Sequence, residues 1–66
     1  MLCKVKWFNK EKGFGFLAPA DGGKDIFCHH SALRKANLQD LVEGQRVEID
    51  VEDAPKGPNA INLRLV

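Results

Sequence analysis

The sequence contains few cysteines, no long apolar run and no export signal. Its two cysteines, Cys3 and Cys28, allow at most one disulfide, whereas secreted domains of this size usually carry several. No apolar run approaches the roughly 20 residues that a membrane span needs. The first residues alternate charged and apolar side chains instead of forming a basic start followed by an apolar stretch. We therefore expect a soluble, cytoplasmic protein with two free thiols.

Residue patterns for catalysis and metal binding are also lacking. A chain of 66 residues buries only roughly 60% of its unfolded surface, which leaves no room for a deep cleft between domains. Ser31 lies beside His29 and His30, but we expect it to begin a helical turn rather than to act as a nucleophile. Cys28 and His29 face opposite sides of a strand, and no CxxC or HxxxH spacing is present. We expect a protein that is not an enzyme, with no catalytic residues, no metal, no cofactor and no small-molecule substrate.

Charge and aromatic residues are distributed unevenly along the chain. The net charge is only +1, but residues 1–35 hold seven Lys and Arg against three Asp and Glu, a net +4. Residues 36–66 hold three against six, a net −3. All five aromatic residues also lie in the positive half: Trp7, Phe8, Phe14, Phe16 and Phe27. The coincidence of basic and aromatic side chains indicates an interaction surface in this half.

Five short segments have the composition and alternation of β-strands. They cover residues 2–9, 14–18, 25–29, 47–51 and 61–65, and they are separated by turn residues such as Gly13, Asp21-Gly22, Gly44 and the Pro55 to Pro58 loop. Residues 31–42 are ambiguous, because Ser31 could cap a helix while Leu33, Leu38 and Leu41 follow helical periodicity only loosely. Five short strands in so few residues favour an all-β domain closed into a small antiparallel barrel.

The second and third predicted strands each have two apolar faces. Phe14, Phe16 and Phe27 share one side with His29, and Gly15, Leu17, Ile26 and Cys28 share the other. The smaller side chains suit the interior of a small barrel, which leaves the rings outside among lysines. An exposed apolar patch rimmed by charge marks an interaction site, and rings on a basic surface suit unpaired nucleic-acid strands. The alternative is that the three phenylalanines form the core and pack on residues 31–42.

Three short motifs resemble the bacterial cold-shock proteins and the cold-shock domain. They are residues 6–9 (KWFN), 12–16 (KGFGF) and 25–29 (DIFCH), of which the second and third are similar to the two ribonucleoprotein motifs. Gly44 and residues 56–60 (KGPNA) also lie where that family has its late turns. The resemblance covers nearly the whole chain, and we expect residues 1–66 to form a single cold-shock domain.

This resemblance implies a five-stranded antiparallel oligonucleotide-binding (OB-fold) barrel that binds single-stranded RNA and DNA with low sequence specificity. The family acts as RNA chaperones or as regulators of transcription and translation, and we expect a monomer that does not bind membranes. Phe8 is expected at the rim of the site. The residues expected to bind nucleic acid are Lys6, Trp7, Lys12, Phe14, Phe16, Phe27, His29, His30 and Lys56.

Two positions depart from the family pattern. Members usually have phenylalanine where this chain has His30, and often an aromatic residue near Leu38. We therefore expect weaker binding than is usual for the family, with some gain below about pH 6.5, where an unperturbed histidine becomes protonated.

A protein-interaction module that uses the same exposed aromatic patch is the competing hypothesis. Salt dependence separates the two functions, because nucleic-acid binding weakens steeply with salt through counterion release, whereas an apolar protein contact hardly changes.

Overall fold

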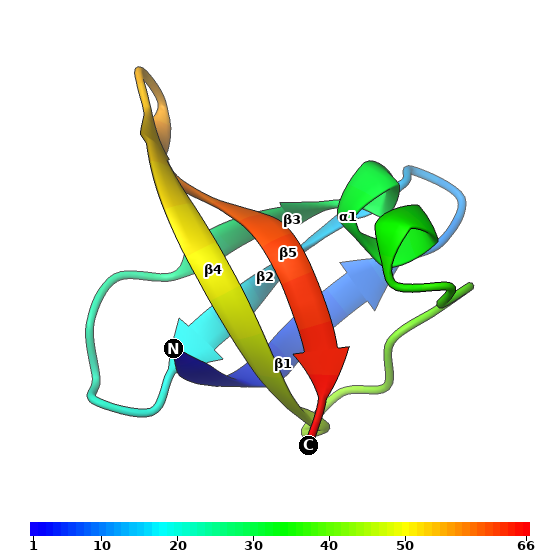
Figure 1. The fold of residues 1–66 in the computed structure, drawn as a ribbon, viewed down its shortest axis with the longest axis horizontal. Coiled ribbons are helices and arrows are strands. Elements are labelled where there is room, and N and C mark those ends of the chain that lie inside the picture. The colour runs from blue at the N-terminus through cyan, green and yellow to red at the C-terminus, as the bar shows by residue number, and fades with distance from the viewer.

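The computed structural model describes all 66 residues as five strands and one short helix. The elements are β1 (Leu2–Asn9), β2 (Phe14–Pro19), β3 (Ile26–His29), α1 (His30–Lys35), β4 (Arg46–Ala54) and β5 (Gly57–Leu65). The strands close into a barrel in the order β1-β2-β3-β5-β4 (Figure 1). The predicted all-β barrel is therefore confirmed. Its strand directions are mixed rather than purely antiparallel, because β3 and β5 pair in parallel at Phe27 and Asn59.

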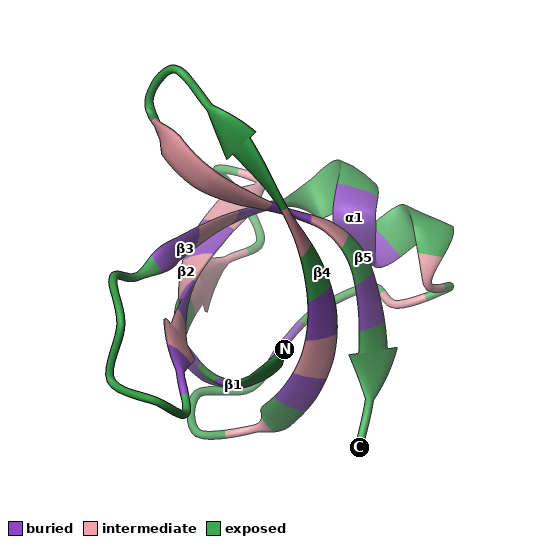
Figure 2. Cartoon of the chain, turned by 60° about the vertical axis from the view of Figure 1, so that its left-hand side comes forward, coloured by how far each residue is buried: buried purple, intermediate pink, exposed green.

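Buried residues alternate with more exposed ones along the strands (Figure 2). The buried residues that fill the barrel have small and branched apolar side chains. The core consists of Cys3, Val5, Leu17, Ile26, Cys28, Ala32, Leu33, Leu41, Val47, Ile49, Ala60 and Leu63. Phe14, Phe16 and Phe27 are absent from it and lie partly exposed on the outer side. The prediction that the rings lie outside is confirmed, and the alternative of a phenylalanine core is wrong, because the smaller residues on the opposite sides of β2 and β3 already fill the interior.

A β-bulge in β1 decides which way Trp7 faces. Cys3 and Val5 point inward, and simple alternation would point Trp7 inward as well. The register of β1 against β2 shifts between Val5 and Trp7, so that Trp7 pairs with the outward Phe16 and Phe8 turns towards the core. Trp7 thereby joins the outer aromatic side chains.

Glycine is required at position 15, opposite this bulge. A Cβ atom there would lie 2.3 Å from the Trp7 carbonyl oxygen and 2.6 Å from the Phe8 Cα atom. Both are backbone atoms with little freedom to move, so any side chain at position 15 would push β1 and β2 apart.

The ambiguous segment after β3 forms one helical turn and a loop. α1 spans six residues and buries Ala32 and Leu33. Its N-cap is His29 rather than the expected Ser31, because the His29 ring accepts a hydrogen bond from the Ser31 backbone N–H. The helix ends before Asn37, which has a positive φ of 60°.

The hairpin between β4 and β5 is longer than the sequence predicted. Pro55 and Pro58 indicated a loop over residues 55–58, but β5 begins at Gly57 and pairs with Ala54, while Pro58 pairs with Asp53. Only Pro55 and Lys56 form the turn. The two strands therefore extend beyond the barrel as the projecting hairpin of Figure 1.

Both cysteines are buried and unpaired, which confirms the prediction of free thiols. Burial raises the pKa of the Cys28 thiol from 9.0 to about 11 and also raises the pKa of Cys3. Separately, no helix has the length and apolar character that crossing a membrane requires.

Candidate nucleic-acid interface

Six rings form one continuous surface on the outside of β1, β2 and β3 and at the start of α1. We call this surface the aromatic face; it consists of Trp7, Phe14, Phe16, Phe27, His29 and His30. The Trp7 ring lies 5.6 Å from Phe14 and 5.5 Å from Phe16, measured between centroids. Phe27 lies 5.7 Å from Phe14, with the two rings nearly parallel, and 5.9 Å from Phe16. The six aromatic residues and histidines expected to bind nucleic acid therefore belong to one cluster, whereas Phe8, expected at the rim, packs against the core.

The strands position these rings through their register. Phe14 is paired with His29, and Phe16 is paired with Phe27, so outward residues of β2 and β3 stand side by side. Some of the rings meet edge to face and others lie nearly parallel, and all keep part of their surface exposed. Trp7 is 39% exposed. An exposed ring surface of this kind can accept a stacked base without rearrangement of the backbone.

The two histidines form the end of the aromatic face, where β3 passes into α1. Their ring centroids are 4.2 Å apart at an angle of 44°. The His29 Nδ1 atom accepts from the Ser31 N–H, so the neutral ring carries its proton on Nε2. The His30 N–H donates to the Gly13 carbonyl at 2.8 Å, which ties α1 to the loop between β1 and β2. The position that carries His30 is thus fixed beside the rings.

The three predicted lysines lie in different settings. The Lys6 ammonium donates to the Asp25 carboxylate at 2.7 Å, and both side chains are exposed. An exposed pair of this kind contributes at most about 1 kcal/mol, so an incoming phosphate can compete for Lys6. Lys12 lies in the loop before β2, where its backbone N–H donates to the Asn9 side chain. Lys56 lies in the turn of the projecting hairpin.

A groove connects the hairpin to the aromatic face. This hairpin groove has a volume of about 600 Å³, and Phe16 and Phe27 line it together with Lys56, Pro58 and Asn59 of the hairpin. One wall therefore presents rings and the other presents a cation, a proline and a carboxamide. The structure brings Lys56 beside both phenylalanines, although it lies 29 positions after Phe27 and 40 after Phe16 in the sequence.

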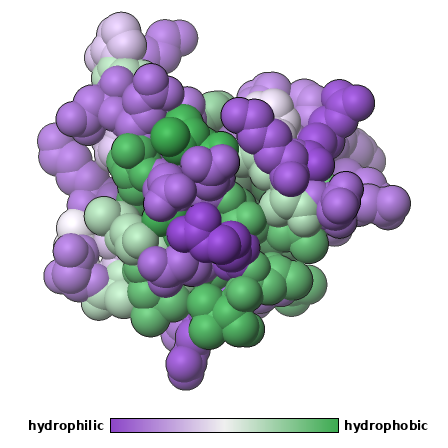
Figure 3. Space-filling view, viewed as in Figure 1, coloured by the Kyte–Doolittle hydropathy of each residue, from purple (hydrophilic) through white to green (hydrophobic).

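The face formed by β4 and β5 has the opposite character. Glu48, Asp50 and Glu52 point away from the core, and hydrophilic side chains lie across the middle of this face in Figure 3. Hydrogen bonds from Asn62 and Arg64 lower the pKa of Asp50 below its usual range. Glu48 and Asp50 thus place negative charge on the outside of β4, whereas Glu52 belongs to the part of β4 that pairs with Asn59 in the hairpin.

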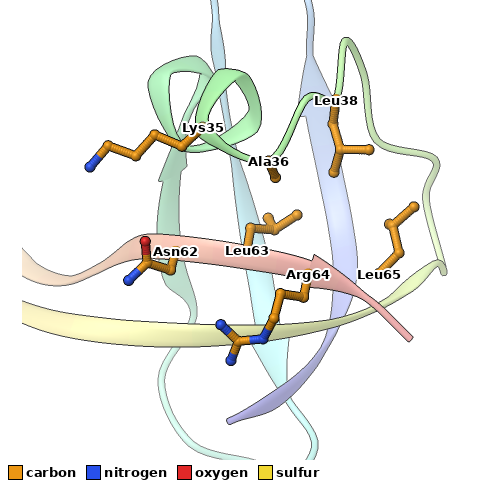
Figure 4. A pocket seen from close by; sticks show the side chains of 7 residues that line it. All are labelled: Lys35, Ala36, Leu38, Asn62, Leu63, Arg64 and Leu65. Carbon is orange, nitrogen blue, oxygen red and sulfur yellow. The ribbon is translucent and has the colours of Figure 1, made fainter.

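A second hollow, of about 480 Å³, lies between α1 and β5 (Figure 4). Leu38 and Leu63 form its apolar floor, and Lys35 and Arg64 stand at its margin. Leu38 packs partly against the core. Leu38, near which the family often has an aromatic residue, therefore lines this hollow and lies outside the aromatic face.

Sequence reasoning missed three residues of the site. Asp25 holds Lys6, and Pro58 and Asn59 form part of the hairpin groove. Residues 56–60 were recognised as a family motif, which could have indicated Pro58 and Asn59. The pairing of Lys6 with Asp25 reaches across β2, which lies between β1 and β3 in the barrel, and no local pattern indicates it.

Comparisons with known proteins agree with this geometry. The model of the 'Cold-shock' DNA-binding domain matches residues 1–66. Cold shock-like protein CspC of Shigella flexneri is 52% identical over 63 residues, covering 96% of this chain and 91% of that protein. Cold shock-like protein CspJ of Salmonella typhimurium (strain SL1344) is 56% identical over 59 residues, covering 89% of this chain and 84% of that protein. The chain belongs to the cold-shock domain family, and it is a nucleic-acid-binding domain rather than an enzyme.

Proposed function

We propose that this protein binds single-stranded RNA and DNA with low sequence specificity along the aromatic face. The observation that carries the proposal is the unbroken series of exposed rings from Trp7 to His30 on the positive half of the molecule. A base stacked on an aromatic side chain contributes about 1 to 3 kcal/mol, whichever base it is. Stacking of this kind requires unpaired bases, so duplexes should bind poorly.

Three lysines would neutralise the phosphates between the stacked bases. Lys6 and Lys12 flank the aromatic face near Trp7 and Phe14, and Lys56 stands over the hairpin groove beside Phe27. The strand would therefore run across β1, β2 and β3 towards the hairpin. The acidic outer side of β4 would repel a strand that approached from the other side.

We infer that the cellular role is that of an RNA chaperone or of a regulator of transcription or translation. A surface that stacks bases without reading their edges holds any unpaired segment and prevents it from pairing again. Such binding suits a protein that acts on many transcripts. The names of the relatives, cold shock-like proteins, support a role of this class.

The second candidate is a protein-interaction module that uses the same aromatic face. Exposed rings attract apolar protein surfaces as well as bases. The lysines around the rings favour nucleic acid, because an apolar partner surface would leave these cations without partners.

Quenching of Trp7 fluorescence on titration with a short oligothymidine at two salt concentrations tests the proposal. Trp7 is the single tryptophan and stands on the aromatic face, so its signal reports on that face alone. We expect saturable quenching that weakens as salt increases, since phosphate contacts release counterions. No quenching at low salt and micromolar protein would contradict the proposal and favour a protein partner.

A further inference from the structure

The last residues of β5 form a free strand edge outside the aromatic face. On one side, β5 pairs with β4 along its whole length. On the other side, its pairing with β3 is limited to Asn59 and Phe27. After Ala60 this second edge of β5 therefore faces no strand, and the hollow between α1 and β5 lies beside it. A free strand edge offers backbone hydrogen bonds to another chain.

The register identifies the backbone groups that point to this edge. The Ile49 N–H donates to the Met1 carbonyl at 2.8 Å, so the backbone groups of Ile49 point towards β1 and away from β5. Ile49 is paired with Leu63, and both members of such an antiparallel pair turn their N–H and C=O groups away from each other. Leu65, two residues further on, has the same orientation. The backbone groups of Leu63 and Leu65 therefore point to the hollow, and no turn or cap hydrogen bond engages them.

Apolar side chains border the same edge. Leu63 is buried, Leu65 is 51% exposed, and Leu38 and Ala36 line the hollow with them. Figure 4 shows these four side chains around one space between β5 and the chain that leaves α1. Hydrophobic side chains also reach the surface in the lower part of Figure 3, the side on which β5 ends in Figure 1. Exposed apolar surface beside a free strand edge indicates a docking site for another chain.

The charge of the hollow distinguishes between the candidate occupants. Its ionisable lining residues are Lys35 and Arg64, both cationic. A second copy of this chain, seated by two-fold symmetry, would bring four cations together, which opposes self-association. A nucleic-acid strand would find no aromatic ring among the lining residues on which its bases could stack. The hollow therefore suits a protein segment that carries negative charge.

We propose that the hollow between α1 and β5 binds an extended acidic segment of a partner protein, which adds to the free edge of β5 as a further strand. Backbone hydrogen bonds to Leu63 and Leu65 provide the affinity, as in other complexes formed by strand addition. Apolar side chains on one face of the segment fill the space between Leu38 and Leu65. Asp or Glu side chains on its other face pair with Lys35 and Arg64.

Arg64 can accept such a carboxylate although it already lies near an acid. Its Nη1 atom is 3.6 Å from the Asp50 carboxylate, and both side chains are about half exposed. A guanidinium has five N–H donors, so this single contact leaves donors for a second carboxylate. The residues that line the hollow are also separate from the aromatic face. The protein can therefore hold a nucleic-acid strand and a partner protein at the same time.

The test titrates ¹⁵N-labelled protein with a blocked peptide of about nine residues, the length of a strand, in which valine and glutamate alternate. We expect saturable shifts centred on the amides of Leu63 and Leu65, slower hydrogen exchange of both amides, and little change at Trp7. The control peptide has lysine in place of glutamate. It should bind at least about fivefold more weakly, because its charges meet Lys35 and Arg64.

Two matched pairs of variants locate the site. Leu65→Asp should weaken binding of the glutamate peptide at least about tenfold, because it removes apolar contact and adds like charge. Leu2→Asp is its control, since Leu2 is also exposed but lies on β1, outside the hollow. Arg64→Gln should weaken binding about two- to fivefold, whereas Arg46→Gln, on β4, should not. The arginine pair and the two peptides keep the test valid if Leu65→Asp does not fold.

The inference is overturned if the glutamate peptide leaves Leu63 and Leu65 unshifted, or if the two peptides bind equally. Concentration-dependent shifts of these amides without peptide would assign the hollow to a second copy of the chain. Larger shifts of the same amides with oligothymidine than with the peptide would assign it to nucleic acid. Either assignment would also overturn the inference. Binding of oligothymidine at Trp7 is measured separately, so the proposed function stands or fails independently.

Discussion

The barrel has two outer faces that share one interior and differ in chemistry. On β2 and β3 the outward positions carry phenylalanine and histidine, whereas on β4 they carry glutamate and aspartate. The inward positions of all these strands are alike, with small and branched apolar residues. The fold therefore depends on the inward set, and function depends on which residues occupy the outward set. Exposing rings in place of acids weakens a small barrel, and under the proposed function the gain is a surface on which bases stack.

Neighbouring residues of β3 allow the sharpest test of this comparison. Phe27→Ala removes the ring between the aromatic face and the hairpin groove, and we expect the affinity for oligothymidine to fall about 5- to 150-fold. Ile26→Ala removes a buried side chain instead and should lower the free energy of unfolding by about 2 to 5 kcal/mol. Trp7 quenching and urea denaturation measure the two effects. If both substitutions reduced stability equally and left binding unchanged in the folded protein, the separation of the two faces would be wrong.

Gly15→Ala should damage both properties together, because Gly15 lies where β1 crosses β2. The added methyl group would press on the Trp7 carbonyl and the Phe8 backbone. We expect a loss of about 1 to 3 kcal/mol in the free energy of unfolding and a loss of affinity, since Trp7 and Phe16 would shift apart. Gly22→Ala is the control for adding a methyl group without a clash, because a Cβ atom at position 22 would meet no atom within 4 Å. The positive φ of Gly22 adds some backbone strain to this variant. Equal stability of Gly15→Ala and the unmodified protein would contradict this account of the bulge.

Charge on the two faces should affect binding unequally. Lys12→Gln removes a cation beside the rings, and we expect affinity to fall several-fold and the slope of log affinity against log salt to decrease by about 0.7. Arg46→Gln removes a cation from the outer side of β4 and should change the slope little. Titrations at four or more salt concentrations measure the slopes. Similar effects of both substitutions would show that total charge, rather than its position, governs binding.

The smallest expected effect concerns His30. Protonation of this ring would add a positive charge at the end of the aromatic face, so the unmodified protein should bind oligothymidine about twofold more tightly at pH 5.5 than at pH 8. His30→Phe should bind at least as tightly at pH 8 and show a smaller change with pH. The remaining change would come from His29, which shares the end of the face. Equal affinities of the unmodified protein at both pH values would show that histidine charge does not contribute to binding.

Much of the fold could be predicted from the sequence because β-alternation is local. The inward and outward sides of β2 and β3 follow from residues two apart, and Leu17, Ile26 and Cys28 are buried as predicted. The direction of Trp7 could not be derived in this way, since the bulge reverses the alternation after Val5. Trp7 was assigned to the site only through resemblance to the family.

Features that depend on contacts between distant strands were less predictable. The parallel pairing of Phe27 with Asn59 brings the hairpin beside the rings and creates the groove. The ion pair of Lys6 with Asp25 likewise joins β1 to the loop that precedes β3. These features arise when the barrel closes, and local composition carries little information about them.

Backbone amide shifts of the ¹⁵N-labelled protein, followed by NMR during titration with oligothymidine, test the central claim most directly. We predict that the largest shifts fall on β1, β2 and β3 around Trp7, Phe16 and Phe27 and on the turn of the hairpin. Residues 46–50 of β4 should shift little, because their outer side is acidic and faces away from the rings. Equal shifts over both faces, or shifts centred on β4, would contradict the account.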